Sequence, residues 1–208
     1  MIRWTALGMG IWLLSWTGTA SAQEKKVQLG LRLGYGLVAG KASSDSESLS
    51  NSISGQIPIW LDAGYLVVPH LLVGLYGQYG IALVKKCDPD PGANCSGHDL
   101  RFGVQGQYHF SPTESADPWF GLGVGYESLV VTESRPTVTH PFTSNGWEFV
   151  NVQGGTDFKL SDRFTLGPFL SVSFDQFSTD KADNSSFDIK DKSLHEWITL
   201  GAKGAFGL

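Results

Sequence analysis

Apolar and polar residues alternate with a period of two along most of the chain. In the stretch VQLGLRLGYGL, residues 27–37, every second residue is apolar or aromatic, and glycine, glutamine or arginine fills most positions between them. The same alternation recurs in seven further segments, at 57–65, 71–83, 100–110, 119–127, 149–160, 166–175 and 197–208. Successive side chains of a strand point to opposite faces, so we predict eight strands with one apolar face each.

The connections between these segments alternate between short and long. Short ones fall at 67–70, 111–118 and 161–163, and long polar ones at 40–52, 85–98, 132–146 and 178–192. Consecutive antiparallel strands put all the long connections at one end. The pattern therefore predicts an all-β fold, an eight-stranded antiparallel up-and-down transmembrane β-barrel with both termini at the end of the short turns.

The direction of the apolar face separates two kinds of barrel. A soluble lipocalin-like carrier keeps its apolar side chains inside, whereas a membrane barrel turns them outward. Here the opposing face consists mainly of Gly, Gln, Ser and Asn with scattered charges, and aromatic residues gather near the strand ends. Both features favour the membrane barrel, and the lipocalin-like carrier is the alternative.

Eight charged residues fall on the face predicted to point into the lumen. An isolated charge in a narrow lumen is costly, so we expect these residues to pair. Hairpin register places Arg32 diagonal to Asp62 and Arg101 diagonal to Glu127. We predict a polar plug that closes the lumen, with a small-solute channel as the alternative. The set is Arg32, Asp62, Arg101, Glu127, Asp157, Lys159, Asp175 and Lys203, and by the same alternation Phe149 also points inward.

The N-terminal segment has the form of a secretory signal. Residues 1–22 contain Arg3, an apolar stretch at 6–16 and the sequence Ala20-Ser21-Ala22, which signal peptidase accepts. The apolar stretch is too short to span a bilayer as a helix. We therefore predict a signal peptide at 1–22, followed by a single barrel domain at 23–208.

The chain has 2 cysteines, Cys87 and Cys95, on either side of the turn-rich sequence DPDPGAN. Export to an oxidising compartment favours a disulfide between them. A metal site that uses both cysteines and His98 is the alternative, but a fourth ligand and the usual CxxC spacing are missing.

Composition excludes several functions. A charged fraction of 17% and a net charge of −5 argue against a disordered tail and against nucleic-acid binding.

The motifs that could indicate catalysis or nucleotide binding lie within predicted strands. The glycines of GLGVGY, residues 121–126, lie within such a strand, where they do not form a phosphate-binding loop. His195 with Glu196, and Glu127 with Ser128, are strand neighbours on opposite faces and cannot form a dyad. We predict no catalytic, cofactor-binding or metal-binding residue and no enzyme, with a lipid-modifying barrel enzyme as the alternative.

In this layout, residues 25–208 resemble the small outer-membrane barrels of the OmpA and OmpX kind. The last stretch, HEWITLGAKGAFGL, resembles the terminal strand that the outer-membrane assembly machinery recognises, although it ends in Leu208 rather than an aromatic residue. The resemblance implies the outer membrane of a Gram-negative-type cell, contact with its lipids and lipopolysaccharide, and a structural, adhesive or ligand-binding role through the loops. It specifies no surface ligand.

Overall fold

The computed structural model describes residues 26–85, 94–135, 138–182 and 185–208, so the predicted signal peptide lies outside it. Within those ranges, no helix is long and apolar enough to cross a membrane. The elements are β1 (Val27–Gly40), α1 (Leu49–Ser52), β2 (Ile53–Val68), β3 (Leu71–Val84), β4 (Asn94–His109), β5 (Ala116–Arg135), β6 (Val138–Lys159), β7 (Phe164–Ala182), β8 (Ser185–Asp188) and β9 (His195–Gly207).

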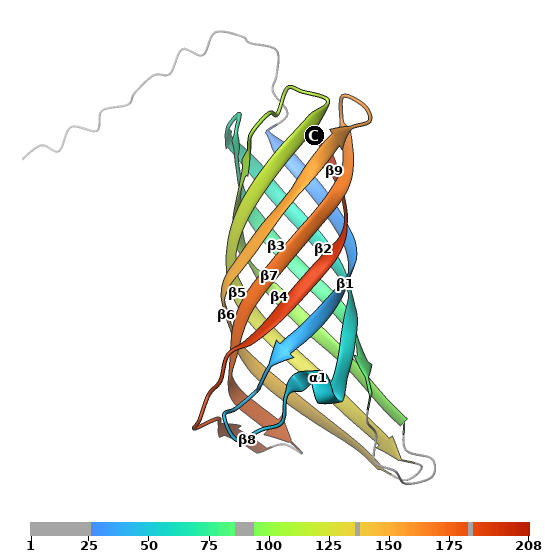
Figure 1. The fold of residues 1–208 in the computed structure, drawn as a ribbon, viewed down its shortest axis with the longest axis vertical. Coiled ribbons are helices and arrows are strands. Elements are labelled where there is room, and N and C mark those ends of the chain that lie inside the picture. Colours follow the sequence, from blue (N-terminus) through green and yellow to red (C-terminus); the bar gives the residue numbers. More distant parts are fainter. Residues whose placement is uncertain (1–25, 86–93, 136–137, 183–184) are drawn as a thin grey trace, which may run out of the picture.

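The strands close into an antiparallel barrel. Each strand from β1 to β7 pairs with the next, and β9 pairs with both β7 and β1. The remaining strand, β8, pairs only with β7 and lies outside the ring, which leaves the predicted eight strands in the wall. Figure 1 shows the short turns and the C-terminus at one end, hereafter the turn end, with α1 and β8 at the opposite loop end.

Two of the predicted long connections are wrong, because the strands continue through them. β5 extends to Arg135 and β6 begins at Val138, with pairs running from Ser128 with Asn145 up to Arg135 with Val138. The predicted connection at 132–146 is therefore mostly a hairpin. In the same way β7 reaches Ala182, and β8 folds back along it within the predicted connection at 178–192.

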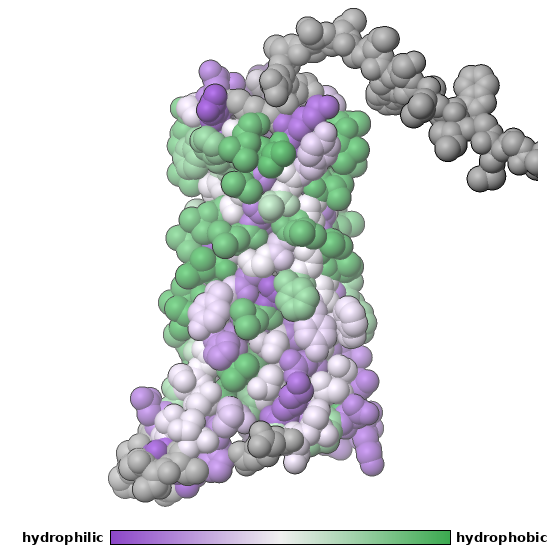
Figure 2. Space-filling view, turned by 180° about the vertical axis from the view of Figure 1, so that it is seen from behind, coloured by the Kyte–Doolittle hydropathy of each residue, from purple (hydrophilic) through white to green (hydrophobic). Residues whose placement is uncertain are grey.

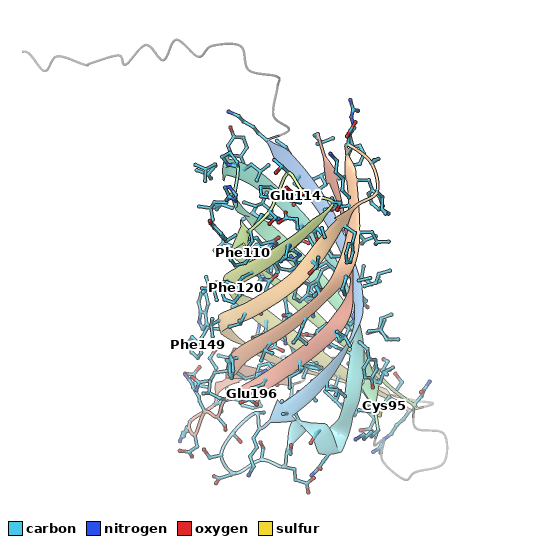
Figure 3. All side chains as sticks on the ribbon, turned by 45° about the horizontal axis from the view of Figure 1, so that its top comes forward. Cys95, Phe110, Glu114, Phe120, Phe149 and Glu196 are labelled. Carbon is cyan, nitrogen blue, oxygen red and sulfur yellow. The ribbon has the colours of Figure 1, made fainter. Side chains whose placement is uncertain are left out.

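The outer wall is apolar, as the alternation predicted. Leu61 and Leu200, for example, are 65% and 64% exposed, whereas their inward neighbours Trp60 and Thr199 are buried. Figure 2 shows hydrophobic side chains over the wall from the turn end to the middle, and hydrophilic ones at the loop end. The aromatic residues Phe110, Phe120 and Phe149 lie on the outside of the ring (Figure 3).

The prediction for Phe149 is wrong because β6 contains a β-bulge. Glu148 pairs with Asp175 and Val150 pairs with Phe174, so β6 has one residue more than β7 at this point. An extra residue reverses the face of every side chain on one side of the bulge. Phe149 is 52% exposed, and Glu148 points into the lumen instead.

Candidate functional site

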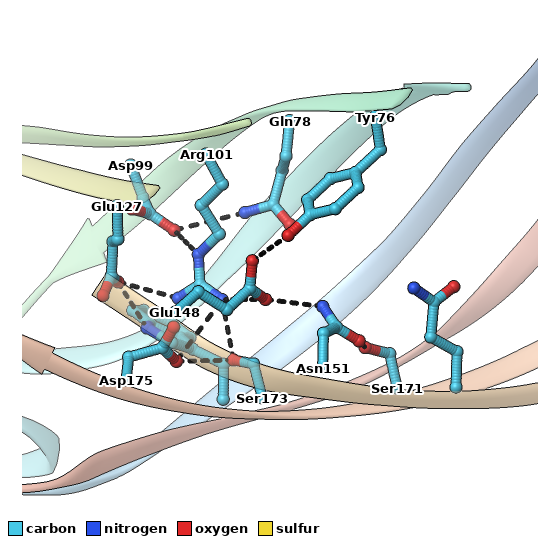
Figure 4. A network of polar contacts seen from close by, with 12 residues as sticks. Tyr76, Gln78, Asp99, Arg101, Glu127, Glu148, Asn151, Ser171, Ser173 and Asp175 are labelled. Atoms are coloured by element: carbon cyan, nitrogen blue, oxygen red, sulfur yellow. Dashed lines mark hydrogen bonds and ion pairs between the residues drawn. The ribbon is translucent and has the colours of Figure 1, made fainter. Parts of the chain in front are cut away.

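The loop-side half of the lumen contains a hub around Arg101 of β4. Its Nε donates to Asp99 Oδ2 over 2.8 Å and its Nη2 to Glu127 Oε1 over 2.7 Å. Its Nη1 donates to Ser173 Oγ over 2.7 Å and lies 3.6 Å from carboxylate oxygens of both Glu148 and Asp175. All these side chains are buried, and Figure 4 shows their hydrogen bonds and ion pairs. Four carboxylates therefore surround one guanidinium; we call these five residues the Arg101 cluster.

Polar side chains from neighbouring strands hold the carboxylates of the Arg101 cluster in place. His195 Nε2 donates to Glu127 Oε2 over 2.8 Å, and Trp197 Nε1 donates to Glu127 Oε1 over 3.0 Å. Tyr76 donates its hydroxyl proton to Glu148, and Asn151 donates to the other oxygen of that carboxylate. Such charge-assisted bonds fix the geometry of the cluster.

A second set of ion pairs occupies the turn-side half. Arg32 donates to both oxygens of Asp62, over 2.7 and 3.0 Å, and Lys203 Nζ donates to Asp157 Oδ2 over 3.0 Å. The Arg32 guanidinium also lies 4.9 Å from the ring centre of Trp60, within the range of a cation–π contact. With Trp119 and Phe169, Trp60 forms a buried aromatic layer that crosses the lumen.

The loop end of the lumen is closed by apolar side chains. Phe177 and Trp197 are 0% and 2% exposed, and Phe177 stacks on the His195 ring at 4.2 Å. Together with Ile189, which follows β8, and residues from β1, β2, β3 and β5 they form a cluster between the Arg101 cluster and the loops, which we call the apolar seal. Its members are Val38, Ile53, Ala82, Leu129, Phe177, Ile189 and Trp197.

Of the eight charged residues predicted to point inward, seven are buried and paired or within 4 Å of an opposite charge. Lys159 is the exception: its side chain is 47% exposed and pairs with Asp162 over 3.3 Å, because β6 ends at this residue. Arg32 lies diagonal to Asp62 as predicted, opposite Trp60. Arg101 lies directly opposite Glu127 rather than diagonal to it.

The sequence prediction missed two members of the Arg101 cluster, Asp99 and Glu148, and the residue that contacts Glu127, His195. Asp99 and His195 fit the alternation once β4 and β9 are extended to their observed starts. Glu148 had no such signal, since only the bulge turns it inward.

Groups that resemble catalytic sets do not form a nucleophilic site in the described chain. Glu196 lies on the opposite face from the buried His195, as predicted. At the turn end, His109 Nδ1 lies 2.7 Å from Asp117 Oδ2, with Ser111 two residues after His109. However, it is the Ser111 backbone N–H that contacts Asp117, over 2.9 Å, so this carboxylate supports the turn.

The predicted cysteine pair lies only partly within the described residues. Cys87 falls outside them, so the disulfide remains a prediction. Cys95 is at the start of β4, and His98 stacks on Tyr79 with ring centres 5.7 Å apart.

The loop end also presents a hollow of about 370 Å³ outside the seal. Phe142 of β6 and Phe187 of β8 contribute apolar surface, and they are 42% and 49% exposed. Hydroxyl and charged groups share the lining, among them Ser43, Asp180, Lys190 and Asp191. We call this feature the loop-end hollow.

Comparison with solved structures identifies the architecture. Neisserial surface protein A matches 86% of this chain and 97% of its own, at 13% identity and a TM-score of 0.51. The outer membrane protein OprG from Pseudomonas aeruginosa covers 89% of this chain and 98% of its own, at 14% identity and a TM-score of 0.52. The chain has the fold of the small outer-membrane β-barrels. Its apolar wall and this fold together give it an outer-membrane location.

A third match has the same fold. A major outer membrane protein from Thermus thermophilus covers 86% of this chain and 99% of its own, at 15% identity and a TM-score of 0.52. No protein-family model and no curated protein matches the sequence. At such low identity the likeness concerns the fold alone.

Proposed function

We propose that this protein is a closed outer-membrane barrel that acts through the surface at its loop end. The filled lumen is the observation that carries the proposal. The apolar seal, the Arg101 cluster and the aromatic layer follow one another along the barrel, and each consists of buried side chains from several strands. An eight-stranded barrel is narrow enough for side chains to fill it.

Planar-bilayer recording tests the closed lumen against a small-solute channel. We expect the purified, folded protein to give no stable conductance. The variant Phe177→Ala tests the apolar seal, and the double variant Trp60→Ala/Phe169→Ala tests the aromatic layer. Neither protein should conduct ions, because each keeps the barrier that the other one loses. Stable conductance of the unmodified protein would contradict the closed barrel.

The loop-end hollow is the proposed contact site for a surface ligand. Loops on a rigid scaffold commonly carry binding functions. Exposed aromatic rings beside serine hydroxyls and carboxylates suit a ligand that has both an apolar group and hydroxyl or cationic groups, such as a glycan or a basic peptide.

Adhesion of cells that carry the protein tests this site. We expect the double variant Phe142→Ala/Phe187→Ala to reduce attachment to glycan-coated and peptide-coated surfaces while leaving the amount of folded barrel unchanged. Leu194→Ala is the matched control, since this residue is 48% exposed near the same end and does not line the hollow. Equal attachment of all three proteins would reject the hollow as the contact site.

The proposed membrane partners are lipids and lipopolysaccharide along the wall and the assembly machinery at β9. Phe206 is 40% exposed on the outer face of β9 and pairs with Leu29 and Phe164. We expect Phe206→Ala to lower the fraction of chain that reaches the outer membrane, measured by membrane fractionation and heat-modifiable gel mobility. A change at Leu208, after the last strand, should have less effect.

A further inference from the structure

Three side chains from different strands converge in the loop-side half of the lumen. Glu127 of β5, Asp175 of β7 and His195 of β9 each offer a ligand atom, and these atoms lie within 4.8 Å of one another. All three residues are 0% exposed. We propose that they bind one divalent transition-metal ion, which is a property separate from the surface role proposed above.

The hydrogen bonds around the site leave one atom of each carboxylate available. Arg101 and Trp197 both contact Glu127 Oε1, whereas Glu127 Oε2 faces only His195. Ser173 donates to Asp175 Oδ2, and Figure 4 shows the Asp175 carboxyl directed toward the cluster. Asp175 Oδ1 is fully buried and has no hydrogen-bond partner among the described residues. A buried acceptor without a donor is uncommon in folded proteins, and it suggests a ligand.

The charge of the Arg101 cluster supports a cation independently. Arg101 is the only cation that the described residues place within 4 Å of these carboxylates, apart from the titratable His195. In the ionised form, four carboxylates and one guanidinium leave three negative charges without a counter-ion. Burying such charges is expensive, so the cluster must take up either cations or protons. A divalent ion offsets two of the three charges.

The donor set selects the class of ion. Calcium and magnesium prefer oxygen ligands only, whereas zinc, manganese, cobalt and iron accept an imidazole nitrogen beside carboxylates. Ligand bonds of about 2.0–2.2 Å are compatible with three donor atoms that lie within 4.8 Å of one another, and His195 Nε2 and Glu127 Oε2 are already 2.8 Å apart. To bind the ion through Nε2, His195 moves the proton that Nε2 now donates to Glu127 onto Nδ1, a buried nitrogen that has no hydrogen-bond partner among the described residues, so the ring binds as a neutral imidazole. Arg101 positions the carboxylates.

Metal analysis of the full-length mature protein tests this site. Because the apolar seal covers it, the barrel is refolded in detergent micelles with Zn²⁺, Mn²⁺ or Co²⁺ present, passed over a chelating resin and analysed by mass spectrometry of the elements. We expect one ion per chain, and for Co²⁺ a visible absorption band of nitrogen and oxygen coordination. Asp175→Asn and His195→Gln should each weaken binding by more than about tenfold.

Two controls keep the outcome decisive. Asp157→Asn changes a buried carboxylate in the turn-side half, and His98→Gln removes the histidine nearest the cysteine loop; both should bind as the unmodified protein does. Heat-modifiable gel mobility verifies that every variant folds. Absence of a stoichiometric ion in the folded protein would mean that protons neutralise the cluster and would overturn the proposal. Binding that survives both ligand substitutions would overturn it as well.

Discussion

Tyr76 of β3 reaches across the lumen and donates its hydroxyl proton to Glu148 of β6. Between these strands, β4 and β5 contribute the paired glycines Gly103 and Gly125 beneath the phenol ring. A Cβ at Gly103 would lie 2.6 Å from Tyr76 Oη, and one at Gly125 would lie 2.5 Å from it. The glycines of the GLGVGY stretch therefore give space for a contact across the barrel, as expected for small residues in a narrow lumen.

The first prediction concerns the space that Gly125 leaves beside Tyr76 Oη. Gly125→Ala should destabilise the barrel by about 1–3 kcal/mol, since the new methyl group meets Tyr76 Oη and the Phe102 carbonyl. In a Tyr76→Phe background the same substitution should cost less, because the contact with Tyr76 Oη is gone. Urea unfolding in micelles measures both. Gly77→Ala on the outer face, with nothing within 4 Å, is the neutral control; an equal loss there would reject the steric explanation.

The Arg101 cluster predicts a large effect for substitution of its cation and a small effect for substitution of one of its anions. Arg101→Met leaves the carboxylates without their guanidinium and should cost about 3–5 kcal/mol of unfolding free energy. In metal-free protein, Asp175→Asn should change stability by less than about 1 kcal/mol, because it removes a like charge. Chemical unfolding with chelator present compares the two variants. Greater destabilisation by Asp175→Asn would show that the cluster does not carry excess negative charge.

Two exposed leucines test where the membrane meets the wall. Leu200 lies in the middle of β9 and is 64% exposed, whereas Leu160 follows the end of β6 and is 61% exposed. Leu200→Lys should destabilise the barrel by about 2–4 kcal/mol in lipid, and Leu160→Lys by about 0–1 kcal/mol. Unfolding from lipid vesicles gives both values. Equal costs would mean that the bilayer does not lie between these two levels.

The predicted disulfide is tested by intact mass. Alkylation before and after reduction should add no label to the native chain and two labels to the reduced one. Closing so short a loop contributes about 2–3 kcal/mol through the unfolded state. Cys95→Ser should lower the free energy of unfolding by a similar amount, and labelling of the native chain would contradict the pairing.

Alternation was sufficient to predict the ring, the direction of its faces and most of the inward charges. One apolar face per strand fixes the register, because a slip by one residue would turn every leucine inward. The strand ends were harder to predict, since residues 132–146 are mostly polar and show no clear alternation, which is typical of a loop. Their pairing in β5 and β6 depends on hydrogen bonds between strands that already extend from the wall.

The alternation of residues along one strand cannot predict contacts across the lumen. Glu148 points inward only because Phe149 is the extra residue of a bulge, and no alternation reveals which residue bulges. His195 meets Glu127 although 68 residues separate them along the chain. The Arg101 cluster is thus a product of ring closure, and it is defined by three-dimensional neighbours rather than by spacing.

The strands β5, β6 and β7 are longer than the other strands of the wall, so the barrel is taller on the side that they form. β6 has 22 residues, and β1 has 14. At about 3.3 Å per residue and a tilt of about 40°, β6 rises some 55 Å, about twice the apolar thickness of the outer membrane. Among the described residues, the far ends of β5 and β6 therefore stand furthest from the apolar wall, and an antibody or a protease that approaches the loop end encounters them early.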